Sequence, residues 1–418
     1  MSGKLALLGA ALSLALCACD APRTTPDEQG VSLAPGPCGR GLLVVESDYQ
    51  SSNVSALGLD GSVLSPSLAS SSTESGGFGV GLSGDVVLPA NPQNGPSITL
   101  IDRYPAGVLR FVDLASARVT SELSVATGFR SNPHDYLALS EHKAYVARYE
   151  ANPNPGQQDY DQGGDILIVD PELSAISARI DLASALHGEP AAFSAHPAQL
   201  ARVSGRVFAL LASYANDYSS SAVSRLVEID PSTDALLSTL LLDGLHGCDS
   251  MAVSPDATQL AVACTGDDLR SSSPKLAGSG LALVDISSAP SFVQRFDAAN
   301  LGTDPVGFGL DYPAPGLLFF GTLGHFDDAG AVAALDTLLE LDTATAQVTE
   351  ILRSQSQPFA LGGVRCAVQC GACFAPDAER AGGSVLRFAL DAAGKLDTPK
   401  AVRAETSVGL PPRYLGAF

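Results

Sequence analysis

The stretch Ile168–Pro171 reads IVDP, an apolar run that ends in an aspartate and enters a turn. The same pattern occurs seven times along the chain, and successive aspartates lie 49 to 60 residues apart. An apolar or β-branched run follows each turn, so the repeated unit is built of strands. Repeats of this length are typical of a β-propeller. We therefore predict an all-β fold, a seven-bladed β-propeller. The repeated aspartates are Asp60, Asp113, Asp170, Asp230, Asp285, Asp342 and Asp391.

The repeats also predict how the ring closes. A chain of 418 residues ordinarily suggests two or three domains, but seven blades absorb residues 41–418 as one. Asp60 is preceded by only two strand-like runs, Leu42–Glu46 and Asn53–Leu59, which is one strand too few. The C-terminal run Pro411–Phe418 resembles the missing inner strand. We expect it to pair into the first blade, because an open sheet edge invites aggregation.

Two of the repeats resemble a known family. Residues 132–150 read NPHDYLALSEHKAYVARYE, and residues 248–268 read CDSMAVSPDATQLAVACTGDD. Both resemble the YVTN-type repeat of seven-bladed propellers. Residues 145–148 match its YVAN segment, with Arg148 in place of Asn, and residues 254–256 match its SPD turn. The other units keep only the strand pattern and the closing aspartate. The resemblance implies the fold and no activity, since the family includes binding, scaffolding and enzymatic proteins.

The N-terminus predicts export. Lys4 precedes the apolar stretch Leu5–Ala18, which is too short to span a bilayer as a helix and is typical of a secretory signal. Residues 16–19, LCAC, resemble the bacterial lipobox, which implies cleavage before Cys19 and acylation of that cysteine. Cys17 is the competing lipidation site, and an ordinary cleaved signal is the alternative. We divide the chain into a signal peptide (1–18), a lipidated cysteine with a flexible tether (19–40) and the propeller (41–418).

The predicted anchor sets the location. The membrane is one partner, through acyl chains on Cys19. Asp20 resembles the inner-membrane retention signal of enteric bacteria, but that rule does not transfer to all lineages. We expect a monomer in the bacterial cell envelope, at the outer rather than the inner membrane.

The charge excludes one class of partner. The net charge is −21 and the acidic residues are dispersed. A nucleic-acid binder needs a basic face, and no basic cluster is visible, so we expect no nucleic-acid partner. The excess of carboxylates suits solubility, or else a cationic or metal partner.

The cysteines outside the signal and the lipidation site are Cys38, Cys248, Cys264, Cys366, Cys370 and Cys373. An even number in an exported chain favours disulfides. Cys248 and Cys264 flank one predicted hairpin, so we expect them to be bonded to each other. The other four allow three pairings, and a bond from Cys38 to the triplet would join the two ends of the ring. The alternative for these four is a zinc or iron–sulfur site with Cys38 as the fourth ligand. The triplet spacing also resembles that of radical enzymes that use S-adenosylmethionine, a reading that an exported all-β chain disfavours.

Polar residues at the starts of inner strands are the candidate site. Such positions line one mouth of a propeller's central channel, where side chains can converge on a small ligand or metal. The alternative is that they cap strand ends and form hydrogen bonds within the channel. The candidates are His134, Asp135, His196, Asp249 and Asp304.

A second candidate is a calcium site in the loop 150–165. Asp159, Asp161 and Asp165 stand near two glycines, and oxygen ligands of this kind suit Ca²⁺. The loop lacks the residue order of an EF-hand, and the alternative is a polar surface loop. Apart from this Ca²⁺, we expect no cofactor.

Catalytic signatures are missing from the sequence. It contains no Gly-x-Ser-x-Gly elbow, Walker loop or dinucleotide-binding fingerprint. We therefore expect a lipid-anchored propeller that works as a binding or protein-interaction module, with another envelope protein or a small ligand as partner, rather than an enzyme. The alternative is an exported enzyme, a lactonase-like hydrolase or a metal- or cofactor-dependent oxidoreductase, with its site at the channel mouth.

Overall fold

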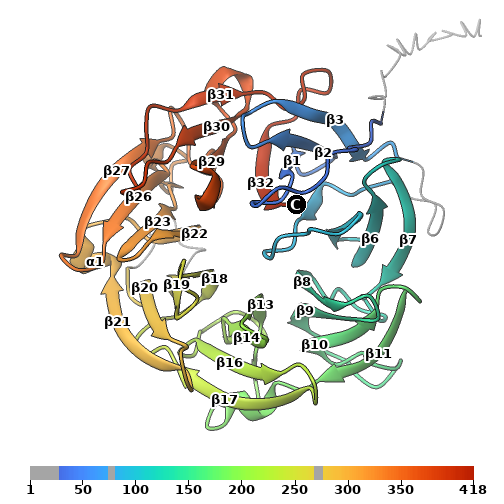
Figure 1. Ribbon diagram of the computed structural model, residues 1–418. Coiled ribbons are helices and arrows are strands. Elements are labelled where there is room, and N and C mark those ends of the chain that lie inside the picture. Colours follow the sequence, from blue (N-terminus) through green and yellow to red (C-terminus); the bar gives the residue numbers. More distant parts are fainter. Residues whose placement is uncertain (1–27, 74–80, 268–275) are drawn as a thin grey trace, which may run out of the picture.

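The computed structural model describes residues 28–73, 81–267 and 276–418. Within them, seven four-stranded antiparallel sheets surround a central axis, which confirms the predicted seven-bladed β-propeller (Figure 1). Short runs of β-branched and aliphatic residues form the strands, because both faces of each blade are covered by its neighbours. From the inner strand outward, the first three blades are β32 (Pro412–Ala417), β1 (Gly41–Ser47), β2 (Ser52–Gly58) and β3 (Val63–Ser70); β4 (Asp85–Val87), β5 (Ser97–Tyr104), β6 (Val108–Asp113) and β7 (Arg118–Ser124); and β8 (Pro133–Ser140), β9 (Lys143–Ala151), β10 (Gly163–Asp170) and β11 (Ala175–Ile180).

The remaining four blades follow the same order. They are β13 (Pro197–Val203), β14 (Arg206–Leu211), β16 (Arg225–Asp230) and β17 (Ala235–Leu241); β18 (Cys248–Val253), β19 (Gln259–Thr265), β20 (Ser279–Asp285) and β21 (Ser291–Asp297); β22 (Val306–Ala314), β23 (Leu317–Thr322), β26 (Thr337–Asp342) and β27 (Gln347–Arg353); and β28 (Arg365–Ala367), β29 (Ala372–Asp377), β30 (Ser384–Ala389) and β31 (Lys400–Val402). Two small ribbons, β12 (Phe193–Ser194) with β15 (Tyr214–Ala215) and β24 (His325–Phe326) with β25 (Val332–Ala334), and the short helices α1 (Ala298–Leu301), η1 (Ala183–Leu186), η2 (Val368–Cys370) and η3 (Arg380–Gly382) lie in the connections.

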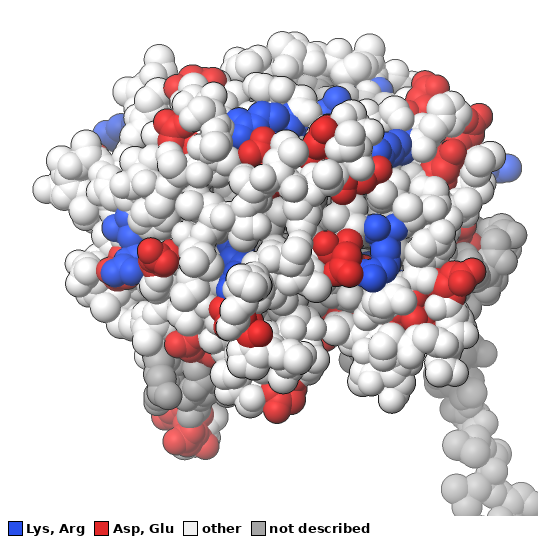
Figure 2. Space-filling view, turned by 90° about the horizontal axis from the view of Figure 1, so that it is seen from below, with Lys and Arg blue, Asp and Glu red and all other residues white. Residues whose placement is uncertain are grey.

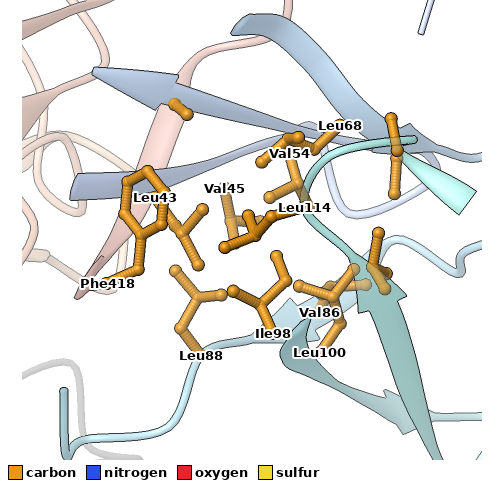
Figure 3. Packing of buried hydrophobic residues seen from close by; sticks show 14 of the residues in the cluster. Leu43, Val45, Val54, Leu68, Val86, Leu88, Ile98, Leu100, Leu114 and Phe418 are labelled. Atoms are coloured by element: carbon orange, nitrogen blue, oxygen red, sulfur yellow. The ribbon is translucent and has the colours of Figure 1, made fainter. Parts of the chain in front are cut away.

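The C-terminal strand closes the ring as predicted. β32 pairs with β1 in antiparallel register, with Leu43 opposite Gly416. The last residue, Phe418, is fully buried. It packs with Leu43 of blade 1 and Leu88, next to the inner strand of blade 2, in a cluster that spans both blades (Figure 3). The two chain ends are therefore held together by strand pairing and by an apolar core.

The two faces of the ring differ. Because neighbouring strands are antiparallel, connections alternate between the faces. Those between the first and second and between the third and fourth strands lie on one face, the turn face, and include tight turns such as 141–142 and 171–174. Those between the second and third strands and from blade to blade lie on the other, the loop face, and include the longer segments 152–162 and 181–192.

The repeated aspartate has a structural role on the turn face. In all seven blades its carboxylate accepts a backbone N–H from two or three residues ahead, at 2.8 to 3.0 Å. This is the local bond that makes aspartate favourable in turns. In Asp60, Asp113, Asp230, Asp285 and Asp342 these bonds lower the pKa of the carboxyl. The most visible repeat in the sequence therefore marks turns and belongs to the fold, not to a site.

The segment before the first blade lies against the ring. The N–H of Gln29 donates to the carbonyl of Ser67 at 2.9 Å, and that of Val31 donates to the carbonyl of Leu114 at 2.6 Å. Val31 is buried in the cluster between blades 1 and 2. Residues 28–40, expected to be part of a flexible tether, are therefore packed on the propeller. Cys19 and the predicted signal lie outside the described residues. No helix among the described residues has the length and hydrophobicity needed to cross a membrane.

Three disulfides are formed. Cys248 and Cys264 face each other in the β18–β19 hairpin and are bonded, as their placement predicts. Cys366 is bonded to Cys373 across the β28–β29 hairpin, and Cys38 to Cys370. The last bond connects residues 332 positions apart in the sequence and joins the N-terminal segment to blade 7. All six cysteines are used, so the four-cysteine metal site considered from the sequence is replaced by two disulfides.

Charged groups are dispersed over the ring. Figure 2 shows Lys and Arg side chains next to Asp and Glu side chains on the side that it presents. Arg206 and Glu228 form one such pair, with the Nε and Oε1 atoms 2.6 Å apart. This interleaving suits solubility, as the composition indicated.

Candidate functional site

A cavity of about 300 Å³ lies in the central channel. Inner strands from opposite sides of the ring contribute to its wall, including β22, β28 and β32. Glycines let these strands approach closely: a Cβ on Gly309, which has a φ of +108°, would lie 2.3 Å from the Cα atom of Gly363. A side chain at either position would narrow the channel. The sequence thus leaves an open space where inner-strand side chains meet.

Two arginines from neighbouring blades line this cavity. Arg413 donates from Nη1 to the carbonyl of Phe359 at 2.8 Å, and its guanidinium lies 5.2 Å from the ring centre of Tyr49. Arg365 begins β28 and is half-buried. Among the described residues, its side chain makes no hydrogen bond or ion pair, so its planar donor groups are available to a ligand.

Asp311 and Asp135 feel the charge of Arg365 but are used by the backbone. Asp311 accepts the N–H of Cys366 at 2.7 Å and that of Tyr312 at 2.8 Å. Burial raises the pKa of its carboxyl, while Arg365 opposes the shift. The carboxylate therefore fixes blade 7 against blade 6.

Asp135, one of the candidates from the sequence, has the same role. It is buried and accepts backbone N–H groups from Ala90, Tyr136 and Leu200, at 2.8 to 2.9 Å. Burial raises its pKa to about 6, and these bonds and Arg365 lower it in part. Because the three donors belong to three successive parts of the ring, Asp135 connects inner strands. This matches the structural alternative considered for the channel-mouth residues.

His134 and His196 come together through a tyrosine. The His134 ring stacks on Tyr149 with centroids 4.0 Å apart, and the His196 ring meets the other side of this group at 4.8 Å from Tyr149. Tyr214 and Tyr218 complete the aromatic cluster around His196. Sequence reasoning placed the two histidines at the channel mouth, but it did not find the tyrosines between and around them.

Both histidines are held in the neutral form. Burial lowers the pKa of His196 to about 4, and burial together with Arg103 lowers that of His134 well below its usual value. Neither ring nitrogen of His196 has a hydrogen-bond partner among the described residues. The backbone oxygens of Tyr149 and Tyr214 oppose the shift electrostatically without reaching hydrogen-bonding geometry.

The two remaining candidates separate. Asp249, at the start of β18, contributes to the electrostatic environment of Tyr149, and burial raises its pKa well above the usual value. Asp304 is exposed in the connection after α1 and interacts electrostatically with Arg353. Asp304 does not line the channel cavity. The structure therefore groups Asp249 with the histidine cluster and leaves Asp304 outside it.

The three calcium candidates also separate. Asp161 is buried and accepts the N–H groups of residues 156–158 at 2.7 to 3.0 Å. Asp165 is bonded to Arg148, and Asp159 is exposed. In the described part of the chain, no three His, Cys, Asp or Glu side chains are grouped so that they could hold a metal ion. The calcium site stays a prediction that these contacts do not favour.

Arg365 and Arg413 are functional candidates that the sequence reading missed. Both stand at the start of an inner strand, as His134 does. The rule that selected His134 would have selected them too, had it been applied to cations and to the C-terminal strand. Tyr49, on the connection between β1 and β2, carries no comparable sequence signal.

Comparisons with known proteins agree on the fold. No family model matches the chain, and no curated protein matches its sequence. Among solved structures, the chain is similar to a protein from Lactobacillus plantarum (TM-score 0.55, 10% identity, 90% of this chain and 98% of the other). It is also similar to the periplasmic gluconolactonase of Pseudomonas aeruginosa (TM-score 0.50, 13% identity, 90% and 98%). A third is the β-propeller domain of Cps50 from Myceliophteria thermophila (TM-score 0.51, 11% identity, 85% and 96%). The chain is a seven-bladed β-propeller. At these identities the likeness concerns the fold alone.

Proposed function

We propose that this protein is an exported, lipid-anchored propeller of the bacterial cell envelope that binds a small anionic molecule in its central channel. The observation that carries the proposal is Arg365, a half-buried arginine on the channel cavity whose donors have no partner among the described residues. Burying an unpaired charge is costly unless something neutralises it. A bound anion would do so.

The surrounding residues favour a carboxylate or phosphate. A guanidinium offers a planar pair of donors that matches the two oxygens of such groups. Arg413, held by Phe359, adds a second positive charge on the same cavity. The cavity volume of about 300 Å³ is at the lower end of the range for small-molecule sites, roughly 300–1,000 Å³. The ligand is therefore a small molecule, not a protein segment.

The proposed location rests on the N-terminal sequence and on the disulfides. Cys19 is the proposed acylation site, and three disulfides suit an oxidising compartment. An acyl anchor at Cys19 leaves the propeller outside the bilayer. Within the envelope we propose a monomer at the outer membrane. A Cys19→Ala variant should lose acyl labelling and leave the membrane fraction, and retention with labelling intact would contradict the site.

Anion binding can be tested by titration calorimetry with gluconate and inorganic phosphate. Wild-type protein should bind at least one of them, and Arg365→Gln should weaken that binding at least tenfold. Arg118 is an exposed arginine on β7 and supplies the matched control, since Arg118→Gln removes the same charge away from the channel. No binding by wild type, or equal losses in both variants, would contradict the proposal.

A second function is favoured by one observation, the pairing of a carboxyl and an imidazole with shifted pKa values. Burial raises the pKa of Asp249 and lowers that of His134, which favours a protonated acid beside a neutral base. Such groups suit general acid–base hydrolysis, and one similar structure is described as a gluconolactonase. Hydrolysis of glucono-δ-lactone that is lost in both His134→Gln and Asp249→Asn would support a lactonase. Binding without turnover would support the binding module.

A further inference from the structure

A second concave surface lies on the loop face, between blades 2, 3 and 4. Its volume is about 980 Å³, and it shares no lining residue with the channel cavity. Six side-chain amides line it, and we call it the amide groove. They are Asn132, Asn152, Asn154, Gln157, Gln158 and Asn216. We propose that the amide groove binds a neutral oligosaccharide.

The amides match the chemistry of sugar hydroxyls. A side-chain amide carries two N–H donors and a carbonyl acceptor, and a hydroxyl both donates and accepts. Among the described residues, the side-chain amides of Asn132, Gln157 and Gln158 make no hydrogen bond. They come from two separate connections, the one before β8 and the one between β9 and β10. A ligand lying between them would be bonded from both sides.

Two aromatic rings provide the apolar half of the site. Tyr104 is 49% exposed, and the guanidinium of Arg130 lies 5.0 Å from its ring centre. Phe129 is half-buried, with the guanidinium of Arg148 5.3 Å from its ring centre. Both tyrosine and phenylalanine line the groove. Aromatic rings are rigid apolar surfaces, and the C–H face of a sugar ring packs on such a surface while its hydroxyls reach the amides.

The walls of the groove are fixed before any ligand binds. The buried carboxylate of Asp161 accepts the backbone N–H groups of Gly156, Gln157 and Gln158, which sets the direction of the chain that carries the amides. Arg148 donates to the hydroxyl of Thr127 and to the carbonyl of Tyr160, at 2.6 Å each, and so connects the two walls. A preformed site loses less conformational entropy when it binds.

Charge favours a neutral ligand over an ionic one. The acidic side chains of the groove already have partners. Asp85 accepts from Nε of Arg103 at 3.0 Å, Glu150 accepts from the Tyr218 hydroxyl, and Asp161 accepts from the backbone. The basic residue, Arg130, packs on Tyr104. No group of like charges is therefore left to select an anionic or cationic sugar.

The test is titration calorimetry of the purified protein with cellotetraose and chitotetraose, and with tetragalacturonate as a charged comparison. We expect wild type to bind at least one neutral tetrasaccharide. Tyr104→Ala and Gln158→Ala should each weaken this binding at least tenfold. Gln347→Ala, which removes an exposed glutamine at the start of β27, should leave it unchanged.

Gluconate titrations on the same variants separate this site from the channel. Tyr104→Ala and Gln158→Ala should bind gluconate as wild type does, because neither residue lines the channel cavity. Gln158 is exposed, so its substitution tests the groove even if the Tyr104 variant does not fold. The proposal is overturned if neither neutral tetrasaccharide binds wild type, if both groove variants bind like wild type, or if tetragalacturonate binds more tightly than both neutral sugars.

Discussion

Arg148 and Asp165 form a buried ion pair at the loop-face end of blade 3. Two N–O distances, from Nε to Oδ1 and from Nη2 to Oδ2, are both 2.8 Å, and both side chains are shielded from solvent. Arg148 stands where the YVTN-type pattern has asparagine. The substitution is accompanied by a carboxylate on the next strand, and the same guanidinium also holds Thr127 and Tyr160. One arginine thus organises the loops of this blade.

Removing the arginine should be strongly destabilising. Arg148→Ala leaves the Asp165 carboxylate buried without its counter-charge, and breaking a buried pair in this way typically costs about 3–5 kcal/mol. The free energy of unfolding, measured by urea denaturation, should fall by that amount. The exposed Arg118 supplies the control, because Arg118→Ala should change the free energy of unfolding by no more than about 0.5 kcal/mol. A loss below about 1 kcal/mol for Arg148→Ala would show that the pair contributes little.

The C-terminal phenylalanine should matter to the whole ring. Phe418 is fully buried between blades 1 and 2, and its N–H donates to the carbonyl of Gly41 at 3.2 Å. Phe418→Ala leaves a cavity at the closure and should reduce the free energy of unfolding by about 3–5 kcal/mol. Leu237→Ala, at an exposed position of β17, is the control and should be nearly neutral. Equal stability of the two variants would mean that closure does not depend on this residue.

The disulfide from Cys38 to Cys370 should stabilise by constraining the unfolded chain. It closes a loop of more than 300 residues, and in the chain-entropy model a loop of that size contributes up to about 5 kcal/mol. The double variant Cys38→Ser/Cys370→Ser should melt at a lower temperature than wild type under oxidising conditions. Under full reduction the difference should disappear. Peptide mapping without reductant checks the pairing itself, and a peptide linking Cys38 to Cys366 or Cys373 would refute it.

Glu46 should make stability depend on pH. It is buried at the end of β1, where it accepts from Asn53 at 2.9 Å and Ser55 at 2.7 Å, and burial raises its pKa from 4.5 to about 8. Between these values the folded state binds the proton more tightly than the unfolded state. This residue's contribution to stability is therefore full below pH 4.5 and decreases as the pH rises towards 8.

Glu46→Gln keeps the shape and removes the titration. Relative to wild type, it should become progressively more stabilising from pH 5 to pH 8, by an amount of several kcal/mol at about 1.4 kcal/mol per pKa unit. Chemical denaturation of both proteins at pH 5, 6, 7 and 8 measures the difference. A difference that does not change with pH would show that Glu46 titrates normally.

The sequence predicted the fold well because its strongest pattern is local. Asp170 and the six equivalent aspartates are required by turns of a few residues, so their spacing is visible without tertiary information. The closing strand followed from counting strands, and Cys248 and Cys264 followed from their positions in one hairpin. Each of these inferences needed only neighbours in sequence or the closure of the ring.

The site was harder to predict because it is assembled across blades. Asp135 looks like a ligand in the sequence, but its oxygens are occupied by N–H groups of Ala90 and Leu200, which are far away in the chain. Arg365 looks like an ordinary surface charge, but the ring places it on the channel cavity. Whether a polar side chain is occupied or available depends on these long-range contacts, and strand patterns do not encode them.

The most direct test of the central claim is a crystal structure of the protein grown with gluconate. We predict electron density for the anion in the channel cavity, with its carboxylate within hydrogen-bonding distance of the Arg365 guanidinium. Density that appears only elsewhere on the protein, or a channel in which Arg365 contacts no anion at saturating gluconate, would contradict the account.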